Sequence, residues 1–331
     1  MAKYLITGIA GFIAARVAEM LMDDGHAVVG IDNLNDAYDV RMKEHRLGIL
    51  QRRPGFQFQQ LDISARAGME ALFSQEYRLA SENHFAAVIN LAARAGVRQS
   101  VENPWVYVDT NVTGTLNLLE LSQRFGVPKF ILASTSSVYG ANAPLPTSEE
   151  AVSDQPLQPY AASKKGAEVM CHAYHYLYGI DVTIFRYFTV YGPAGRPDMI
   201  MFRLAQWINE GKPVLVNGDG EQSRGFTYID DIARGTILGL QPTGYQVINL
   251  GGHETVKVNE LIRMFEEIIG KKARIEHRPA HPADMQANWA EVEKAGRLLG
   301  WEPLYSLKQG ITNLIKWYEA ERSWASQIRT D

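Results

Sequence analysis

Apolar residues in the first half of the chain gather in short runs, and segments with helical spacing separate these runs. Between the first two runs, Ile13, Val17 and Leu21 recur at the spacing of one helix face. The apolar runs predict strands over residues 4–7, 27–32, 56–58, 87–90, 130–134 and 182–186. The helical spacing predicts helices over residues 12–24, 104–125 and 159–178. This alternation predicts an α/β fold with right-handed crossovers and a doubly wound parallel sheet, and we expect a loop over residues 33–46.

The pattern changes after about residue 192. Helical segments over 201–211 and 258–270 alternate there with brief β runs over 213–216 and 245–250. Clusters of Gly, Pro and Asn over 192–197 and 217–220 predict turns. We therefore divide the chain into a doubly wound domain over residues 1–191 and a smaller mixed α/β region over 192–331. We expect a cleft between them, and whether segments cross back from one part to the other stays open.

A short glycine turn joins the first predicted strand to the first helix. Gly8 and Gly11 lack the Cβ that would keep the backbone away from a pyrophosphate, and a helix N-terminus offers it N–H groups and a positive dipole. Asp32 ends the second strand, where a carboxylate accepts hydrogen bonds from an adenosine ribose and repels a 2′-phosphate. This order predicts a Rossmann site for NAD rather than NADP. The further residues expected along the cofactor are Phe12, Ile13, Asn33, Asp62, Ile63, Leu91, Ala92 and Ala93.

A tyrosine and a lysine lie one turn apart on the predicted helix over 159–178. Tyr160 is a weak base at neutral pH because the pKa of a free phenol is about 10. Lys164 and an oxidised nicotinamide are both positive, so each would favour the phenolate. The predicted strand over 130–134 runs into a row of hydroxyls, residues 134–137, at the sheet edge where open parallel sheets bind ligands. The residues therefore predict proton transfer beside a nicotinamide.

Composition narrows the class of protein further. The 331 residues carry 33 Lys and Arg against 37 Asp and Glu, a net charge of -4 that argues against a nucleic-acid binder. The single cysteine, Cys171, excludes an intrachain disulfide. His172 and His175 have metal-ligand spacing on one helix, but a third ligand is not evident, so we expect no metal. No apolar run is long enough to span a membrane, and the N-terminus does not resemble a signal peptide, so we expect a soluble cytoplasmic protein.

The motifs, taken in order, resemble those of the extended short-chain dehydrogenases/reductases of the sugar-nucleotide epimerase/dehydratase group. They comprise the glycine turn, Leu91-Ala92-Ala93, Asn111-x-x-Gly114-Thr115, residues 134–140, Tyr160-x-x-x-Lys164, residues 186–193 and residues 226–231. The resemblance covers residue 3 to about residue 320. Ala14 stands where the family usually has glycine, and Gly225 stands within a common Arg-Asp-Phe motif.

The resemblance implies a mechanism. Tyr160 takes the proton of a sugar 4-hydroxyl while the C4 hydride passes to NAD, and Thr135 hydrogen-bonds the same oxygen. Lys164 holds the nicotinamide ribose. The family pattern adds four residues to the cofactor side: Asn111, Ser134, Tyr187 and Val190. It also implies a homodimer formed through the helices over 104–125 and 159–178.

The residues after Thr135 discriminate among the reactions of the group. Relatives that dehydrate carry Asp-Glu at these two positions, because dehydration needs an acid and a base, and relatives that decarboxylate UDP-glucuronate typically carry Ser-Glu. This chain has Ser136 and Ser137, so the resemblance favours simple 4-epimerisation. Residues 31–40 and 192–199 resemble those of UDP-glucuronate 4-epimerases. That resemblance implies that the substrate carboxylate is surrounded by Ser136, Ser137, Thr189 and Arg196. The alternative for Arg196 is a solvated arginine in a Gly/Pro turn.

The resemblance also places the UDP part of the sugar nucleotide. Arg224 and Arg203 are expected near the diphosphate, and either His281 or Arg278 supplies a further contact close to Asp284. We therefore predict conversion of UDP-glucuronate to UDP-galacturonate. The nearest alternative is a 4-epimerase of UDP-glucose and UDP-galactose or of their N-acetyl forms. UDP-glucuronate decarboxylation and a non-catalytic NAD sensor are the others, and a sensor has no need of a base such as Tyr160.

Overall fold

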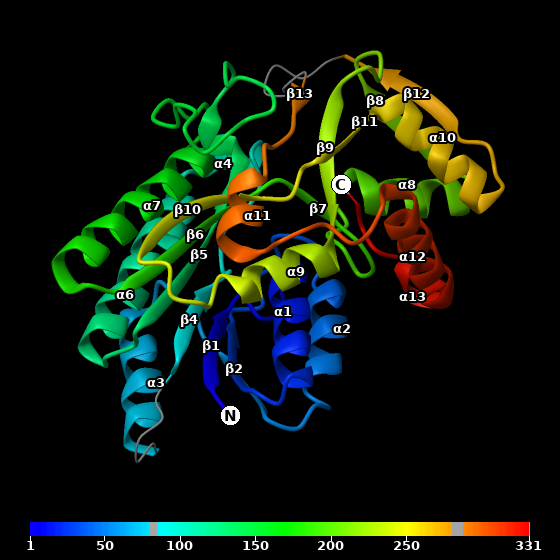
Figure 1. Cartoon of the computed structure of the whole chain (residues 1–331). Helices are drawn as coiled ribbons and strands as arrows, with labels where there is room; N and C mark the ends of the chain where they lie inside the picture. Colours follow the sequence, from blue (N-terminus) through cyan, green and yellow to red (C-terminus); the bar gives the residue numbers. More distant parts are fainter. Residues whose placement is uncertain (80–84, 280–286, 331) are drawn as a thin grey trace.

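A seven-stranded parallel sheet forms the centre of the computed structural model, which describes residues 1–79, 85–279 and 287–330 (Figure 1). Its strand order is β10-β6-β5-β4-β1-β2-β3. The strands are β1 (Lys3–Thr7), β2 (Ala27–Asp32), β3 (Phe56–Gln60), β4 (Ala87–Asn90), β5 (Lys129–Thr135), β6 (Asp181–Tyr187) and β10 (Tyr245–Leu250). The predicted α/β fold and its parallel sheet are confirmed.

The central strands are apolar at successive positions because helices cover both faces of the sheet. Leu5 of β1 packs into the core on one face, and its neighbour Ile6 packs into the core on the other. Ile131 and Leu132 of β5 divide in the same way. Burial on both faces explains why these strands appear in the sequence as unbroken apolar runs.

The helices form two layers around this sheet (Figure 1). Helices α3, α6 and α7 cover one face, and α1, α9 and α11 pack on the other. The α-helices are α1 (Phe12–Asp23), α2 (Arg41–Leu50), α3 (Arg66–Leu79), α4 (Gln99–Glu102), α5 (Trp105–Tyr107), α6 (Gly114–Arg124), α7 (Pro159–Tyr178), α8 (Ile200–Asn209), α9 (Ile229–Leu238), α10 (Val258–Ile269), α11 (Glu293–Leu299), α12 (Leu307–Ala320) and α13 (Arg322–Ala325). A π-helical turn, η1, spans Val108–Thr113, and a 3-10 turn, η2, spans Ser136–Tyr139.

Two predicted segments differ from the structure. The loop expected over residues 33–46 ends at Val40, because α2 begins at Arg41. Its buried face includes Lys43 and Arg46, and these charges obscure the apolar period that would indicate a helix. The helix expected over 104–125 consists of α5, η1 and α6, because apolar spacing alone does not separate a π turn from an α turn.

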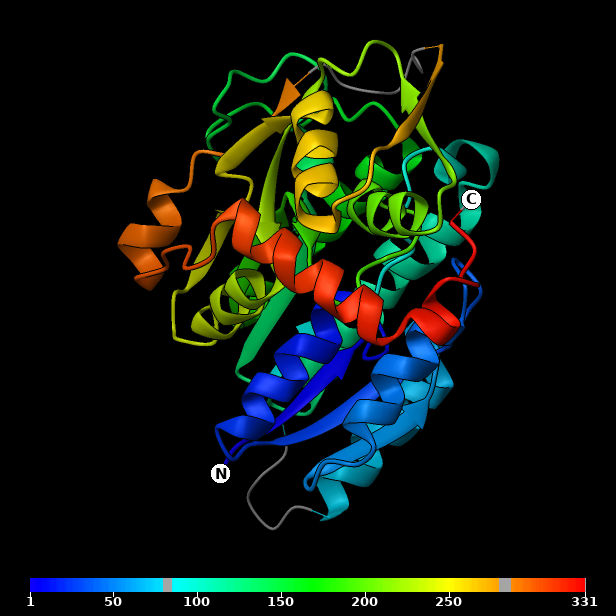
Figure 2. The same cartoon turned by 90° about the vertical axis from the view of Figure 1, so that its right-hand side faces the viewer.

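The second part of the chain builds two smaller sheets above the carboxyl edge of the first. In the described residues, β9 (Ser223–Tyr228) pairs with β7 (Thr189–Tyr191), β11 (Glu254–Lys257) and β13 (Ala287–Asn288), while β8 (Pro213–Asn217) pairs with β12 (Arg274–Arg278). Figure 2 shows α12 crossing toward α2, where Trp317 and Trp324 pack against His45.

Segments from after residue 191 also pack on the first sheet. Strand β10 is its edge strand beside β6, and α9 lies against α1. The guanidinium of Arg16 in α1 donates to both carboxylate oxygens of Asp230 in α9, at 2.7 and 3.1 Å. None of the helices that the structure describes is both long and apolar enough to cross a bilayer.

Candidate functional site

The carboxyl edge of the sheet opens into a cavity of about 770 Å³ between the sheet and the smaller region. Most of the residues that the sequence predicts for the site line this cavity. They are Gly8, Gly11, Phe12, Ile13, Asp32, Asn33, Asp62, Ile63, Leu91, Ala92, Ala93, Ser134, Thr135, Ser136, Ser137, Tyr160, Lys164, Tyr187, Thr189, Val190, Arg196, Arg203 and Arg224. Asn111 and Arg278 do not line it. His281 and Asp284 lie outside the described residues.

The glycine turn forms a cradle that side chains would fill. Gly8 has a φ of +68°, and a Cβ added there would lie 2.7 Å from the Cα of Ala92. The Gly11 N–H donates to the Gly8 carbonyl at 2.8 Å, and no side chain caps the N-terminus of α1. The first N–H groups of α1 are therefore available to an anion, as a dinucleotide pyrophosphate requires.

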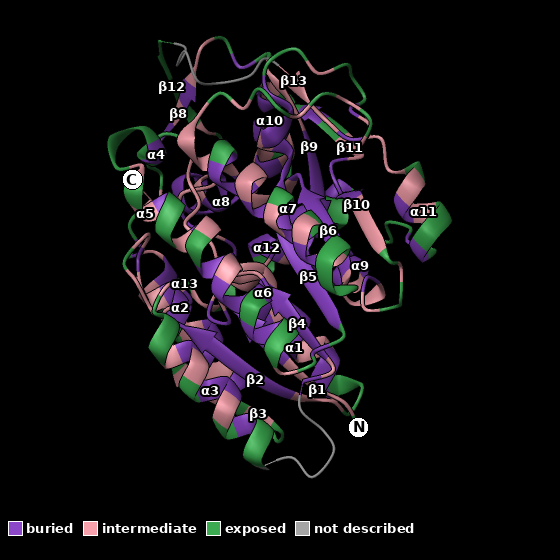
Figure 3. Cartoon of the chain, turned by 90° about the vertical axis from the view of Figure 1, so that its left-hand side faces the viewer, coloured by how far each residue is buried: buried purple, intermediate pink, exposed green. Residues whose placement is uncertain are grey.

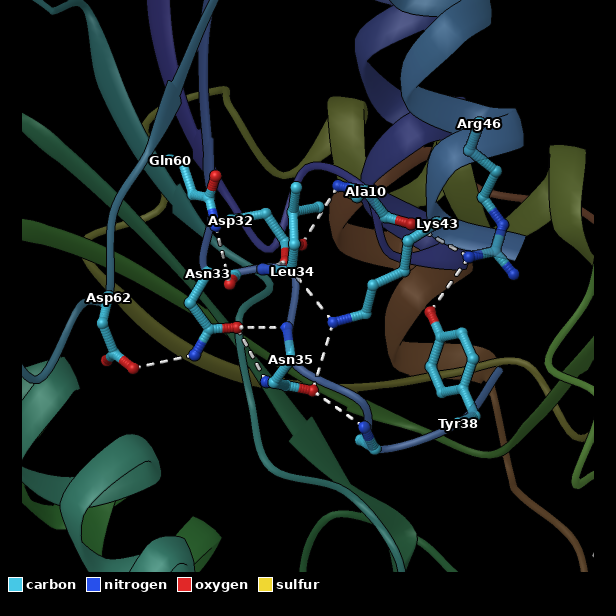
Figure 4. Close-up of polar contacts among 11 residues, drawn as sticks. Ala10, Asp32, Asn33, Leu34, Asn35, Tyr38, Lys43, Arg46, Gln60 and Asp62 are labelled. Atoms are coloured by element: carbon cyan, nitrogen blue, oxygen red, sulfur yellow. Dashed lines mark hydrogen bonds and ion pairs between the residues drawn. The ribbon is translucent and has the colours of Figure 1, made fainter. Parts of the chain in front are cut away.

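Asp32 lies at the end of β2 and is almost fully buried (Figure 4). It accepts hydrogen bonds from the Ala10 N–H at 3.1 Å and the Leu34 N–H at 2.8 Å. The ammonium of Lys43, itself only 5% exposed, lies 3.4 Å from the same carboxylate. Lys43 therefore provides a counter-charge for the buried Asp32 carboxylate at the cavity wall.

Lys43 was not predicted as a site residue, although the sequence carries a signal for it. The buried positions of α2 are Met42, Lys43, Arg46, Leu47 and Leu50, which recur at helical spacing. Two cations on the buried stripe of a helix indicate a polar site behind it, because isolated charges are costly to bury. The neighbouring Asn35 accepts a hydrogen bond from Lys43 at 3.2 Å (Figure 4).

Tyr160 and Lys164 project from the first turns of α7 into the cavity. Burial raises the pKa of Tyr160, whereas its hydrogen bond with Thr135 and the positive charge of Arg196 lower it. Burial lowers the pKa of Lys164 to about 8, against the opposing charge of Glu168. Burial outweighs the effects of Thr135 and Arg196, so the pKa of Tyr160 lies above its usual value in this structure.

A buried ion network lies behind Lys164. The Arg186 guanidinium donates to both oxygens of Glu168, at 3.0 and 2.8 Å, and the Ser134 hydroxyl donates to one of them at 2.6 Å. Burial raises the pKa of Glu168, but the hydrogen bonds and charge of Arg186 outweigh it, so this pKa lies below its usual value. Glu168 therefore remains ionised one turn after Lys164.

Asn111 is fully buried within η1 and connects two elements beside the cavity. Its side-chain oxygen accepts from the Arg94 N–H at 2.9 Å, and its amide nitrogen donates to the Ser163 hydroxyl at 2.9 Å. These contacts fix the segment after β4 against α7. Asn111 therefore supports the residues that form the cavity wall without lining the cavity itself.

The polar residues expected around the substrate carboxylate all line the cavity. Arg196 is part-buried, lines the cavity and pairs with Asp198 at 3.0 and 2.6 Å, contacts that favour the predicted site role over a solvated loop arginine. Ser136 accepts a hydrogen bond from the Asn288 amide at 3.2 Å. Asp198 and Asn288 were not predicted: Asp198 lies only two residues from its partner Arg196, whereas the contact of Asn288 with Ser136 depends on the tertiary structure.

The two arginines expected near the diphosphate also reach the cavity. Arg203 donates to the Thr330 carbonyl at 2.8 Å, and Arg224 donates to the Ser223 carbonyl at 2.8 Å. Close packing explains the glycine after Arg224, because a Cβ added at Gly225 would lie 2.1 Å from the Gly252 carbonyl oxygen. The departure from the family pattern at this position therefore follows from packing.

Comparison with known proteins agrees with the predicted resemblance. A family model described as GDP-mannose 4,6 dehydratase matches residues 5–314. The chain is 54% identical over 318 residues to a UDP-glucuronate 4-epimerase of Thermodesulfobacterium geofontis, and the match covers 96% of each chain.

Solved structures with the same fold include two epimerases. A UDP-glucuronic acid 4-epimerase of Bacillus cereus, in complex with UDP-glucuronic acid and NAD, has a TM-score of 0.88 and 36% identity over 96% of this chain and 99% of that one. A UDP-glucose 4-epimerase of Thermotoga maritima with UDP-glucose has a TM-score of 0.88 and 31% identity over 97% and 99%. With a family model spanning most of its length and these relatives, the chain belongs to the GDP-mannose 4,6 dehydratase family of sugar-nucleotide enzymes.

Proposed function

We propose that this chain is an NAD-dependent 4-epimerase that interconverts UDP-glucuronate and UDP-galacturonate. The observation that carries the proposal is that Arg196 lines the same cavity as Tyr160 and acts electrostatically on it. A guanidinium so close to the proposed base is suited to a sugar acid, whose carboxylate is one carbon beyond the ring. The identity to the Thermodesulfobacterium enzyme supports the same substrate.

In the proposed mechanism, Tyr160 removes the proton of the sugar 4-hydroxyl. The chemistry that bound NAD supplies is the reversible acceptance of a hydride from C4, together with a positive charge that favours the phenolate. Thr135 hydrogen-bonds the reacting oxygen, and Lys164 orients the ribose beside Tyr160. The sugar then turns in the cavity to present its other face, and Tyr160 returns the proton to the 4-oxygen.

The serines after Thr135 favour epimerisation over elimination. Ser136 and Ser137 provide hydroxyls but no carboxylate, so the two positions after Thr135 hold no acid and base for dehydration. The 4-keto sugar acid is a β-keto acid, which loses CO₂ when its carboxylate turns into line with the carbonyl π system. We propose that Thr189, Ser136, Ser137 and Arg196 restrain this rotation.

The two parts of the chain divide the ligands between them. We propose that residues 1–191 hold NAD and that residues 192–331 hold most of the UDP-sugar, with Arg203 and Arg224 near the diphosphate. His281 or Arg278, close to Asp284, remains the proposed further contact. The uncapped N-terminus of α1 and the carboxylate of Asp32 support the placement of NAD.

A product assay tests the function directly. Purified protein is incubated separately with UDP-glucuronate, UDP-glucose and UDP-N-acetylglucosamine, and the products are resolved by NMR. We expect conversion of UDP-glucuronate, with Tyr160→Phe slower by about 10³-fold because the base is lost. The matched control is Tyr77→Phe on the exposed face of α3. Conversion of the neutral sugars alone would overturn the acid-sugar assignment, and no conversion would favour a sensor.

The restraint on the carboxylate has its own test. We expect Thr189→Ala to release a UDP-pentose by-product from UDP-glucuronate, because its hydroxyl no longer holds the carboxylate. The ratio of pentose to epimer in the NMR spectrum is the readout. An unchanged ratio would contradict the restraint without touching the epimerase assignment.

We propose a homodimer, in line with the family resemblance. Large apolar side chains stand exposed on α5, η1 and α7, including Trp105 (75%), Val108 (43%), Val169 (58%) and Tyr176 (82%). Figure 3 shows exposed positions along the outer faces of α6 and α7. Large exposed apolar side chains gathered on neighbouring helices are typical of a protein interface.

We also propose that the protein works in the cytoplasm. Its single cysteine, Cys171, is buried in α7, so the chain lacks the intrachain disulfides common in secreted proteins. Detection of the protein in fractionated cells tests this location.

A further inference from the structure

Arg46 of α2 forms hydrogen bonds with three other segments of the chain around the site. It is 3% exposed. One terminal nitrogen, Nη1, donates to the Ala10 carbonyl of the glycine turn at 2.9 Å and to the Tyr38 hydroxyl at 3.0 Å (Figure 4). The other edge of the guanidinium donates to the Ala194 carbonyl through Nε at 2.9 Å and Nη2 at 2.8 Å.

The charge of Arg46 has an unusual environment. Among the residues that the structure describes, its hydrogen-bond partners are backbone carbonyls and a phenol, and none is a carboxylate. Its guanidinium also lies over the rings of Phe12 at 5.9 Å and Tyr38 at 5.7 Å. A buried guanidinium is costly unless its donors are used, so the planar fork explains why arginine stands here.

The contact with Ala194 controls a strained turn. Ala194 has a φ of +54°, a backbone conformation that residues with a Cβ rarely adopt. Its carbonyl accepts two N–H groups from Arg46, and it lies two residues before Arg196. The strained turn therefore keeps its shape because a charge-assisted fork holds it.

Arg46 also reaches Arg196 by a second route. The Tyr38 ring lies 5.8 Å from the Arg196 guanidinium, and the hydroxyl of the same ring accepts from Arg46. Arg46 thus fixes both the backbone that leads to Arg196 and the ring against which Arg196 lies.

We infer that Arg46 is a positioning residue that fixes Arg196 relative to the glycine turn, and so couples recognition of the sugar carboxylate to the cofactor turn. The inference rests on the proposed function, in which Arg196 binds that carboxylate. It assigns Arg46 no contact with either ligand. It follows that Arg46 affects the binding of UDP-glucuronate more than the binding of UDP, which has no carboxylate.

The decisive variant is Arg46→Lys. Lysine keeps the charge but has no planar fork, so it cannot serve Ala10 and Ala194 together. In holoprotein carrying Tyr160→Phe, which prevents turnover, we expect Kd for UDP-glucuronate to rise about tenfold by calorimetry, while Kd for UDP changes less than twofold. A general loss of structure would weaken both ligands alike. The matched control is Arg52→Lys, an exposed arginine just beyond α2, which leaves both constants unchanged.

A double-mutant cycle separates the inference from the proposed function. We expect Arg196→Ala to weaken UDP-glucuronate at least about tenfold relative to UDP. Adding Arg46→Lys to Arg196→Ala then changes the UDP-glucuronate to UDP ratio less than twofold, because Arg46 acts through Arg196. If Arg196→Ala leaves the ratio unchanged, the carboxylate role in the proposed function fails. If Arg196→Ala changes it and Arg46→Lys does not, the inference alone is overturned.

Tyr38→Phe tests the same coupling if Arg46→Lys does not fold. Phenylalanine keeps the ring beside Arg196 and removes only the hydroxyl to which Arg46 donates. We expect the ratio of the two Kd values to rise at least twofold. An unchanged ratio in folded Tyr38→Phe protein would overturn the inference.

Discussion

Single residues on α7 carry the proposed proton chemistry. Tyr160, Lys164 and Glu168 follow one another at one-turn spacing, and both Lys164 and Glu168 are about 2% exposed. Burial weakens the hold of Lys164 on its proton, and the ionised Glu168 partly restores it. The protonation state of Lys164 therefore depends on the Glu168 carboxylate, which Arg186 keeps ionised.

The first prediction concerns the titration of Lys164. Its pKa in the folded protein is about 8, below the value of about 10.4 for a free lysine. Between these pH values the unfolded chain binds more protons than the folded one, so this residue makes stability rise with pH. We expect Lys164→Met to remove that rise, measured by urea unfolding at pH 8 and pH 10. Lys308→Met, on an exposed position of α12, is the control and should keep the wild-type slope.

The second prediction concerns Glu168→Gln. The substitution leaves the buried Arg186 without its counter-charge, so we expect a loss of roughly 3 kcal/mol in the free energy of unfolding. It also removes the negative charge that raises the pKa of Lys164. We therefore expect the fall in kcat that accompanies loss of the Lys164 proton to occur at lower pH. Urea denaturation and a pH–rate profile measure the two effects. Glu150→Gln, at an exposed position, should change neither, and a Glu168→Gln profile identical to wild type would contradict the link to Lys164.

At the scale of elements, the join between β1 and α1 determines the cofactor side of the site. The chain turns at Gly8 with a positive φ and passes close to the backbone of Ala92 after β4. Two constraints therefore act on one residue: the backbone conformation and the space beside it. Gly25, which follows α1, allows the two constraints to be tested separately. It has a φ of +79°, but nothing lies within 4 Å of an added Cβ.

The third prediction compares these two glycines. Gly8→Ala adds a left-handed penalty of about 1–2 kcal/mol and also pushes the Ala92 backbone out of contact. We expect purified Gly8→Ala protein to lose most of its bound NAD, read from the ratio of absorbance at 260 and 280 nm. Gly25→Ala carries the same backbone penalty without the clash and should retain NAD. Equal retention by both variants would show that the close approach to Ala92 is unimportant.

At the scale of the whole molecule, the two layers of helices have different surroundings. Helices α1 and α9 are covered by packing against each other and by α11 and α2, whereas α7 exposes apolar side chains at its outer face. Figure 3 shows exposed positions along this face of α7. The proposed dimer would bury them without closing the site.

The fourth prediction tests that assembly. We expect Val169→Lys to convert a dimer to a monomer in analytical ultracentrifugation, because a buried lysine would be unpaired in the interface. NAD binding should persist, since Val169 does not line the cavity. Leu304→Lys introduces the same charge at another exposed apolar position, outside α7, and should leave the mass unchanged. A wild-type protein that sediments as a monomer would contradict the proposed dimer.

Much of the fold follows from local patterns. The helix predicted over 159–178 is Pro159–Tyr178 in the structure, and strands β2, β4 and β10 have their predicted bounds. Apolar period, a proline at the start and a glycine at the end are properties of consecutive residues, so they can be read along the chain. The loop expected over 33–46 failed at α2 because its buried face carries charges whose partners lie elsewhere in the fold.

The sequence by itself determined the alternation of strands and helices in the first half of the chain, the glycine turn, the acid after β2 and the Tyr160–Lys164 pair, because each depends on neighbours within one or two elements. Only the tertiary structure decided that Lys43 balances Asp32, that Arg46 holds Ala194, and that β10 returns to the first sheet. These arrangements join residues far apart in the chain. A buried charge is tolerated only where such distant groups pair with it, and the pattern of neighbouring residues does not predict that pairing.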